Sequence, residues 1–133
     1  MRKLEHIGIA VSNLNEANTL YSKILGGKPY KTETIDDEGV ITSFFKVDEI
    51  KIELLQGITD NNAISKFIKK RGEGIHHIAF SVDDIQVEIE RYKKNGFNII
   101  NDIPKKGADN KLICFIHPKS TNHVLIELCQ EIK

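Results

Sequence analysis

The chain has 133 residues, of which 40% are hydrophobic and 29% charged, a composition typical of one compact globular domain. Its 19 basic side chains balance 19 acidic ones without a dense basic run, so we expect no nucleic-acid partner. No apolar stretch approaches the ~20 residues of a membrane span, and the first residues lack the apolar core of a signal peptide. We therefore expect a cytoplasmic protein that does not enter membranes.

The first predicted element is a strand that carries a histidine. Large and small residues alternate here, so that His6, Gly8 and Ala10 share one face, while the two isoleucines between them share the other with Val11. The pattern predicts a strand with one packed face and one open face, and it places the histidine on the open face.

A helix is expected next, because Asn13 and Glu16 resemble a capping box and Gly26-Gly27 is a typical helix end. Apolar residues recur between them at helical spacing: Ala17, Leu20, Tyr21, Ile24 and Leu25. Strands are expected at residues 40–47 and 51–56, and the second of these contains Glu53.

Residues 61–70 are typical of a short helix, and the glycine-punctuated segment Arg71-Gly-Glu-Gly74 follows it. We interpret this region as a helical linker. It divides a single domain, residues 1–133, into two repeats at about 1–58 and 74–133.

The second half repeats the pattern of the first. His77-Ile-Ala-Phe-Ser-Val82 aligns with the first strand, and Ile126-Glu-Leu-Cys-Gln130 matches Ile52-Glu-Leu-Leu-Gln56. A helix capped by Asp83 or Asp84 is expected to end at Asn95-Gly96. Strands are expected at 98–100, 112–116 and 124–129. The sequence thus predicts an α+β fold of two βαβββ modules in tandem.

Two cysteines, Cys114 and Cys129, fall on predicted strands of this half. We expect both to be reduced core residues and not a disulfide.

The repeat places four polar residues in equivalent positions: His6, Glu53, His77 and Glu127. Two imidazoles and two carboxylates suit a divalent ion such as Zn, Co, Ni, Mn or Fe, with positions left for water or substrate. Each residue taken alone has a simpler interpretation, as a hydrogen-bonded core histidine or a solvated strand glutamate. Their repetition favours one metal-containing cleft, because an apolar core does not keep buried carboxylates without a partner.

Several motifs resemble those of the vicinal oxygen chelate superfamily, and most closely those of its methylmalonyl-CoA epimerases. They are His6-Ile-Gly-Ile-Ala-Val, Lys51-Ile-Glu-Leu-Leu, Arg71-Gly-Glu-Gly-Ile-His-His-Ile-Ala-Phe80, His117-Pro-Lys-Ser and Val124-Leu-Ile-Glu-Leu128. The resemblance implies a glyoxalase-like fold and places the four residues above at the metal-ligand positions. Both the resemblance and the repeat favour His77 over His76.

The chain departs from the epimerase pattern at several positions. It has Asp109-Asn110 where a His-Gly pair is usual and Asn122-His123 where a Gly-Gly pair is frequent. A first-half motif of the family appears as Asp36-Asp-Glu-Gly39. Thr42 stands where some members carry a glutamate that acts as a base.

The activity implied by the resemblance is epimerisation of methylmalonyl-CoA at C2, through an enolate stabilised by Co, Mn, Zn or Ni. Glu127 is the first candidate for proton transfer, and Glu53, Asp37 or Glu38 is the candidate for the opposite face. Lys119 and Ser120 are expected to contact the coenzyme A part of an acyl-CoA substrate. A homodimer and a role in propionate metabolism are also expected.

Three other functions use the same fold. A glyoxalase I-type lactoylglutathione lyase would use the same metal and transfer a proton in a glutathione hemithioacetal. A non-catalytic protein that binds a small molecule would not need four ligands. An Fe(II) dioxygenase is the third, because two histidines and one carboxylate can also hold iron.

Overall fold

The computed structural model describes residues 2–133. The chain forms two compact units, one of His6–His76 and one of His77–Lys133 together with the first residues of the chain, up to Glu5. Each unit contains four strands, called here the first and the second sheet, and its own buried hydrophobic clusters, and each is described by itself.

In the unit His6–His76, four strands are ordered β2-β3-β4-β1. They are β1 (Lys3–Ala10, of which His6 onward belongs here), β2 (Lys31–Ile35), β3 (Val40–Val47) and β4 (Ile50–Gly57). β2, β3 and β4 are antiparallel neighbours, whereas β1 runs parallel to β4. The predicted strands at 40–47 and 51–56 are therefore confirmed.

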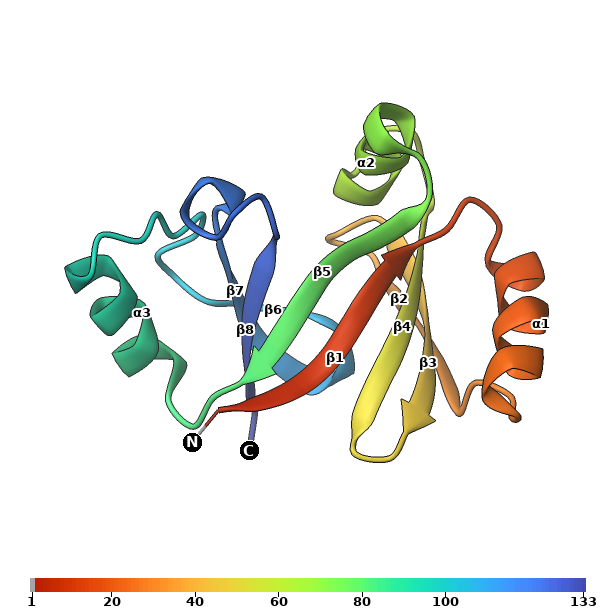
Figure 1. Ribbon diagram of the computed structural model, residues 1–133, viewed down its shortest axis with the longest axis horizontal. Helices are drawn as coiled ribbons and strands as arrows, with labels where there is room; N and C mark the ends of the chain where they lie inside the picture. The colour runs from red at the N-terminus through yellow and green to blue at the C-terminus, as the bar shows by residue number, and fades with distance from the viewer. Residues whose placement is uncertain (1) are drawn as a thin grey trace. The chain divides into compact units, whose positions relative to one another are not determined.

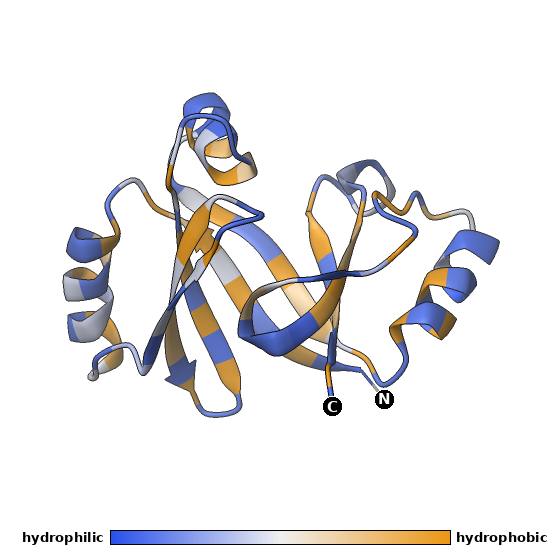
Figure 2. Cartoon of the chain, turned by 180° about the vertical axis from the view of Figure 1, so that it is seen from behind, coloured by the Kyte–Doolittle hydropathy of each residue, from blue (hydrophilic) through white to orange (hydrophobic). Residues whose placement is uncertain are grey.

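Helix α1 (Leu14–Leu25) connects β1 to β2 and packs on one face of this sheet (Figure 1). Asn13 caps it by accepting a hydrogen bond from Glu16 N–H, and Gly26 ends it with a left-handed φ of 78°. Its core contacts include Phe45 and Leu54. The other strand positions point away from α1, which produces the alternating colours along the strands in Figure 2.

Helix α2 (Ala63–Arg71) follows β4 and confirms the predicted helix in the linker. Asn62 caps its start. Its apolar residues pack against the ends of β1, β3 and β4 through a small cluster: Ala10, Val40, Leu55, Ile64, Phe67 and Ile68.

The second unit repeats this connectivity with strands ordered β5-β8-β7-β6. Its elements are β5 (Gly74–Ser81, of which His77 onward belongs here), α3 (Ile85–Lys94), β6 (Lys105–Lys106), β7 (Lys111–Ile116) and β8 (Ile126–Glu131). β5 and β8 are parallel, while β6, β7 and β8 are antiparallel neighbours. Two short 3₁₀ helices, Ala108–Asn110 and Pro118–Ser120, flank β7.

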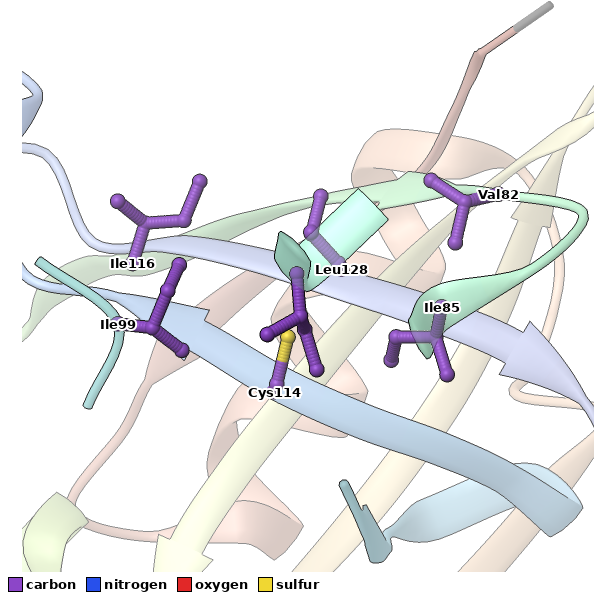
Figure 3. Close-up of a cluster of buried hydrophobic side chains, with 7 residues drawn as sticks. Val82, Ile85, Ile99, Cys114, Ile116 and Leu128 are labelled. Carbon is purple, nitrogen blue, oxygen red and sulfur yellow. The ribbon is translucent and has the colours of Figure 1, made fainter. Parts of the chain in front are cut away.

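The core of this unit lies between α3 and the sheet (Figure 3). It contains the following buried residues: Val82, Ile85, Ile89, Ile99, Cys114, Ile116 and Leu128. Asp84, and not Asp83, caps α3, because its side chain accepts hydrogen bonds from the N–H groups of Gln86 and Val87.

The predicted α+β fold of two βαβββ modules is confirmed, but one predicted strand is wrong. Residues 98–100 form a single β-bridge between Ile99 and Ile116 and not a strand. The short β6, Lys105–Lys106, takes the place of that strand beside β7.

Both cysteines are buried and free, as predicted. None of the helices within residues 2–133 combines the length and the apolar character that a membrane crossing requires.

Candidate active site

The first unit contains a histidine and a glutamate in direct contact. The parallel register of β1 and β4 sets Glu53 beside Gly8, two residues after His6. His6 Nδ1 lies 3.1 Å from Glu53 Oε2, and each residue is only 4% exposed. Gly8 has no side chain and therefore leaves room beside Glu53 for this contact.

The second unit contains an equivalent pair. Glu127 on β8 is the register partner of Ala79 on β5, again two residues after the histidine. His77 Nε2 lies 3.5 Å from Glu127 Oε1, and both residues are 5% exposed. The ring of Phe115 meets the His77 ring edge to face at 6.1 Å between centroids. The repeat seen in the sequence is therefore a repeat of strand register and of burial, although the contact involves Nδ1 of His6 and Nε2 of His77.

These pairs fit the ligand set of a divalent metal ion. A buried carboxylate is costly unless a cation or hydrogen-bond donors compensate its charge. Each unit supplies imidazole nitrogen and carboxylate oxygen, the donors that Zn, Co, Ni and Mn accept. Each unit thus offers two of the four donor groups that the sequence predicts.

A glutamine fixes the end of each glutamate strand against a helix. Gln56 Oε1 accepts a hydrogen bond of 2.6 Å from Leu14 N–H, at the start of α1. Gln130 Oε1 accepts one of 2.7 Å from Ile85 N–H, at the start of α3. The two glutamines are in repeat register, but their role as helix caps has no separate sequence signal.

The face of the first sheet that carries Glu53 also carries Thr42 and Phe44. Phe44 pairs with Glu53 and Thr42 with Leu55 across β3 and β4, and directly paired residues share a face. Thr42 is fully buried, and its hydroxyl has no hydrogen-bond partner in the protein. An unsatisfied buried hydroxyl costs about 1–3 kcal/mol, which a ligand atom could recover.

Two charged residues on this face have no counterpart among the sequence-based candidates. Lys31 pairs with Phe44 and Glu33 with Thr42 across β2 and β3. Lys31 Nζ lies 3.4 Å from Glu33 Oε1 and 4.7 Å from the centre of the Phe44 ring. The signal for them is the alternation along β2, but the sequence analysis predicts no strand there.

The candidate acids Asp37 and Glu38 lie in the turn that joins β2 to β3. Glu38 N–H and Gly39 N–H both donate to Ile35 O, and Gly39 has a left-handed φ of 67°. Asp37 is exposed and Glu38 is half-buried. The turn follows the Ile35–Val40 pair, at the end of the strands away from Phe44.

Lys119 and Ser120 lie in the 3₁₀ helix after β7. Lys119 is exposed, and its N–H donates to His117 Nδ1 at 3.0 Å. Ser120 Oγ accepts a hydrogen bond of 3.0 Å from Asn98 N–H, so its side chain joins this 3₁₀ helix to the segment between α3 and β6.

His76, the neighbour of His77, contacts the linker helix. Its ring meets Phe67 of α2 edge to face at 5.0 Å between centroids. Burial lowers the pKa of His76 to about 4. Its packing in the first unit accounts for its burial without a ligand role.

Further along the second sheet, Lys111 is a buried lysine that the sequence analysis did not single out. It is 6% exposed, and its Nζ lies 3.6 Å from Asp109 Oδ2 and 3.8 Å from Glu131 Oε1. Glu131 is its register partner on β8, and it follows Glu127 on the same face. Alternation with Ile113 and Phe115 could have placed Lys111 on this face.

Residues 5–115 match the model of the glyoxalase/bleomycin resistance protein/dioxygenase superfamily. Among curated relatives, the mitochondrial methylmalonyl-CoA epimerase of Dictyostelium discoideum is 40% identical over 127 residues, which cover 95% of this chain and 76% of that protein.

Solved structures agree with this match. A hypothetical protein from Bacillus halodurans has a TM-score of 0.96 at 42% identity, covering 99% of this chain and 96% of that one. A variant of Streptomyces coelicolor methylmalonyl-CoA epimerase in complex with 2-nitronate-propionyl-CoA has a TM-score of 0.93 at 30% identity, covering 97% and 94%. The glyoxalase-like fold is thereby confirmed, and the chain belongs to the glyoxalase/bleomycin resistance protein/dioxygenase superfamily.

Proposed function

We propose that this protein is a metal-dependent epimerase that inverts C2 of methylmalonyl-CoA. The observation that carries the proposal is the repeated His–Glu contact, buried in each unit beside a small residue of the histidine strand. The names of relatives support the choice of reaction, since the Dictyostelium protein is a methylmalonyl-CoA epimerase. The Streptomyces enzyme of that name was solved with an acyl-CoA analogue.

In this proposal, His6, Glu53, His77 and Glu127 bind one divalent ion, Co, Mn, Zn or Ni. The internal repeat and membership of the superfamily support a single shared ion. The bound ion would supply positive charge that stabilises the negative charge developing on the carbonyl oxygens of the substrate. Such stabilisation matters because the proton to be removed is bound to carbon, and its removal leaves a negative charge that the carbonyl oxygens must carry.

Glu127 is proposed to transfer a proton at C2. Inversion requires that the proton leave one face of this carbon and that another arrive at the opposite face, so a second group is needed. From the sequence, Glu53, Asp37 and Glu38 are the candidates for this group. Asp37 and Glu38 lie in a turn that reaches solvent, which would allow exchange of the proton with water.

Lys119 and Ser120 are proposed to bind the coenzyme A moiety. The exposed ammonium group of Lys119 suits a phosphate, and Ser120 holds the loop that presents it. A homodimer, a cytoplasmic location and a role in propionate metabolism complete the proposal and remain predictions.

The test is hydrogen exchange at C2 of methylmalonyl-CoA in deuterated water, with Co or Mn added to the purified protein. We expect deuterium to enter C2 and each epimer to convert to the other. A glutathione hemithioacetal is assayed in parallel. Turnover of that adduct alone would replace the proposal by glyoxalase-type activity, and binding without exchange of either compound would identify a non-catalytic protein.

A further inference from the structure

The register of the first sheet assigns one more carboxylate to the face of Glu53. The cross-strand pairs Lys31–Phe44–Glu53 and Glu33–Thr42–Leu55 run across β2, β3 and β4, so their side chains share that face. Among the described residues of β1 to β4 in this unit, Glu33 is the one carboxylate on this face besides Glu53.

Strand geometry sets the separation of the two carboxylates. Same-face residues of one strand are ~6.7 Å apart and neighbouring strands ~4.8 Å apart. Glu33 lies two strands away from Glu53, on β2. Along the strand direction it is offset from Glu53 by one same-face spacing, because it pairs through Thr42 with Leu55, two residues after Glu53. Their Cα atoms are therefore ~12 Å apart on the same face of the sheet.

The surroundings of Glu33 suit a group that exchanges protons with a ligand. Its side chain is 32% exposed, so it can exchange a proton with water, while Lys31 lies 3.4 Å away and orients the carboxylate. Thr42, its register partner, points the unpartnered buried hydroxyl to the same face. That hydroxyl is an independent sign that a polar ligand atom belongs here.

We propose that Glu33 is the proton-transfer group that acts with Glu127 on C2, an inference that rests on the proposed epimerase function. The Glu33 carboxylate removes the proton from one face, and the electron pair of the C–H bond passes into the enolate. Protonated Glu127 then delivers its proton to the other face, where that electron pair forms the new C–H bond. For the other epimer the two residues exchange roles.

Besides Glu53, which is also a proposed metal ligand, the turn acids Asp37 and Glu38 are the rivals for this role. They lie beyond the Ile35–Val40 pair. Along the strand direction, this pair is two residues further from Glu53 than Glu33 is. Two residues of a strand span ~6.7 Å, so the backbone of the turn lies further from Glu53 than Glu33 does.

The experiment compares Glu33→Gln with two other variants of the metal-loaded full-length chain. Glu33→Gln keeps the shape of the side chain and removes the base. Glu49→Gln, an exposed residue in the turn between β3 and β4, is the matched control. The double variant Asp37→Asn/Glu38→Gln tests the rivals. For each variant, metal content, deuterium entry and net epimerisation are measured from each epimer separately.

Glu33→Gln should keep its metal and still exchange the C2 hydrogen of one epimer, while net epimerisation falls by ~10²-fold or more. Glu49→Gln should match the wild type in all three measurements. Epimerisation by Glu33→Gln within ~3-fold of the wild type would overturn this inference and leave the epimerase function standing. An inactive wild type would overturn both, and a loss confined to the double variant would assign the role to the turn.

Discussion

Glu53 lies beside Gly8 in the parallel register of β1 and β4, and Glu127 lies beside Ala79 in the equivalent register of β5 and β8. In both units a residue with little or no side chain therefore leaves room for the contact between histidine and glutamate. The same arrangement of histidine, small residue and glutamate occurs in both units, and we therefore expect both His–Glu pairs to serve one function.

The first prediction is that purified protein binds about one divalent ion per chain, because the four proposed ligands form a single set. His6→Ala and His77→Ala should each remove the ion. Metal content after dialysis is the measurement. The control is His123→Asn, since His123 is exposed and asparagine tolerates its left-handed φ of 68°.

Two outcomes would contradict this prediction. Binding of two ions per chain would mean that each His–Glu pair holds its own metal. Retention of metal by both alanine variants, at the affinity and stoichiometry of the wild type, would place the site elsewhere.

The second prediction separates the two proposed roles of Glu127. Glu127→Gln should lose far more turnover than metal, because an amide oxygen can still bind the ion but cannot exchange a proton. The expected loss in rate is ~10²-fold or larger. Turnover and metal content are measured on the same preparation, and unchanged turnover would mean that another carboxylate transfers the proton.

The sequence identifies the histidine and glutamate strands well, because each is marked by alternation and by its copy in the other half. It does not identify β2, whose sequence Lys-Thr-Glu-Thr-Ile has a single apolar residue. β2 is an edge strand whose residues alternate between half-buried and exposed, so no run of apolar residues marks it in the sequence. Glu33 is absent from the sequence-based candidates for this reason.

The mistaken strand at 98–100 has the opposite cause. Two successive isoleucines suggest a strand, but Ile99 is buried in the helix-side core whereas Ile100 is 53% exposed. The pairing of this segment with β7 is limited to the single β-bridge between Ile99 and Ile116. Tertiary packing of Ile99, and not a ladder of hydrogen bonds, accounts for the apolar residue there.

The third prediction concerns the cap of α3. Asp84→Ala should destabilise the protein by about 1 kcal/mol, because the N–H groups of Gln86 and Val87 lose their shared acceptor. Asp83→Ala is the matched control: it is exposed, adjacent in sequence and not the cap. The measurement is the free energy of unfolding in urea, and equal values for the two variants would contradict the assignment of the cap.

The fourth prediction concerns the buried thiol of Cys114. Burial, with a smaller contribution from the charge of Glu127, raises its pKa from 9.0 to about 12. The neutral thiol is favoured in the folded state, so its contribution to stability is complete below pH 9 and is lost as the pH rises toward 12.

Two measurements check this expectation. A thiol reagent at pH 8 should not label Cys114 until the protein is unfolded, because the thiolate is scarce and buried. Between pH 9 and 12 the wild type should lose stability relative to Cys114→Ala. Parallel stability curves for the two proteins across that range would contradict the raised pKa.

The last prediction concerns the close approach of β4 to the start of α2. A Cβ atom at Gly57 would lie 2.1 Å from Ser65 Oγ and 2.5 Å from Asn62 Oδ1, the atom that caps α2. Gly57→Ala should therefore push the helix start away from the strand and cost about 1–3 kcal/mol. Gly27→Ala is the matched control, because a Cβ there meets nothing within 4 Å.

Thermal unfolding should show a melting temperature lower by about 4 °C or more for Gly57→Ala. The Gly27→Ala variant should unfold at the temperature of the wild type or slightly above it, since alanine restricts the unfolded chain. Equal melting temperatures for the two variants would show that α2 can move without cost, and the packing of Asn62 against Gly57 would then not stabilise the fold.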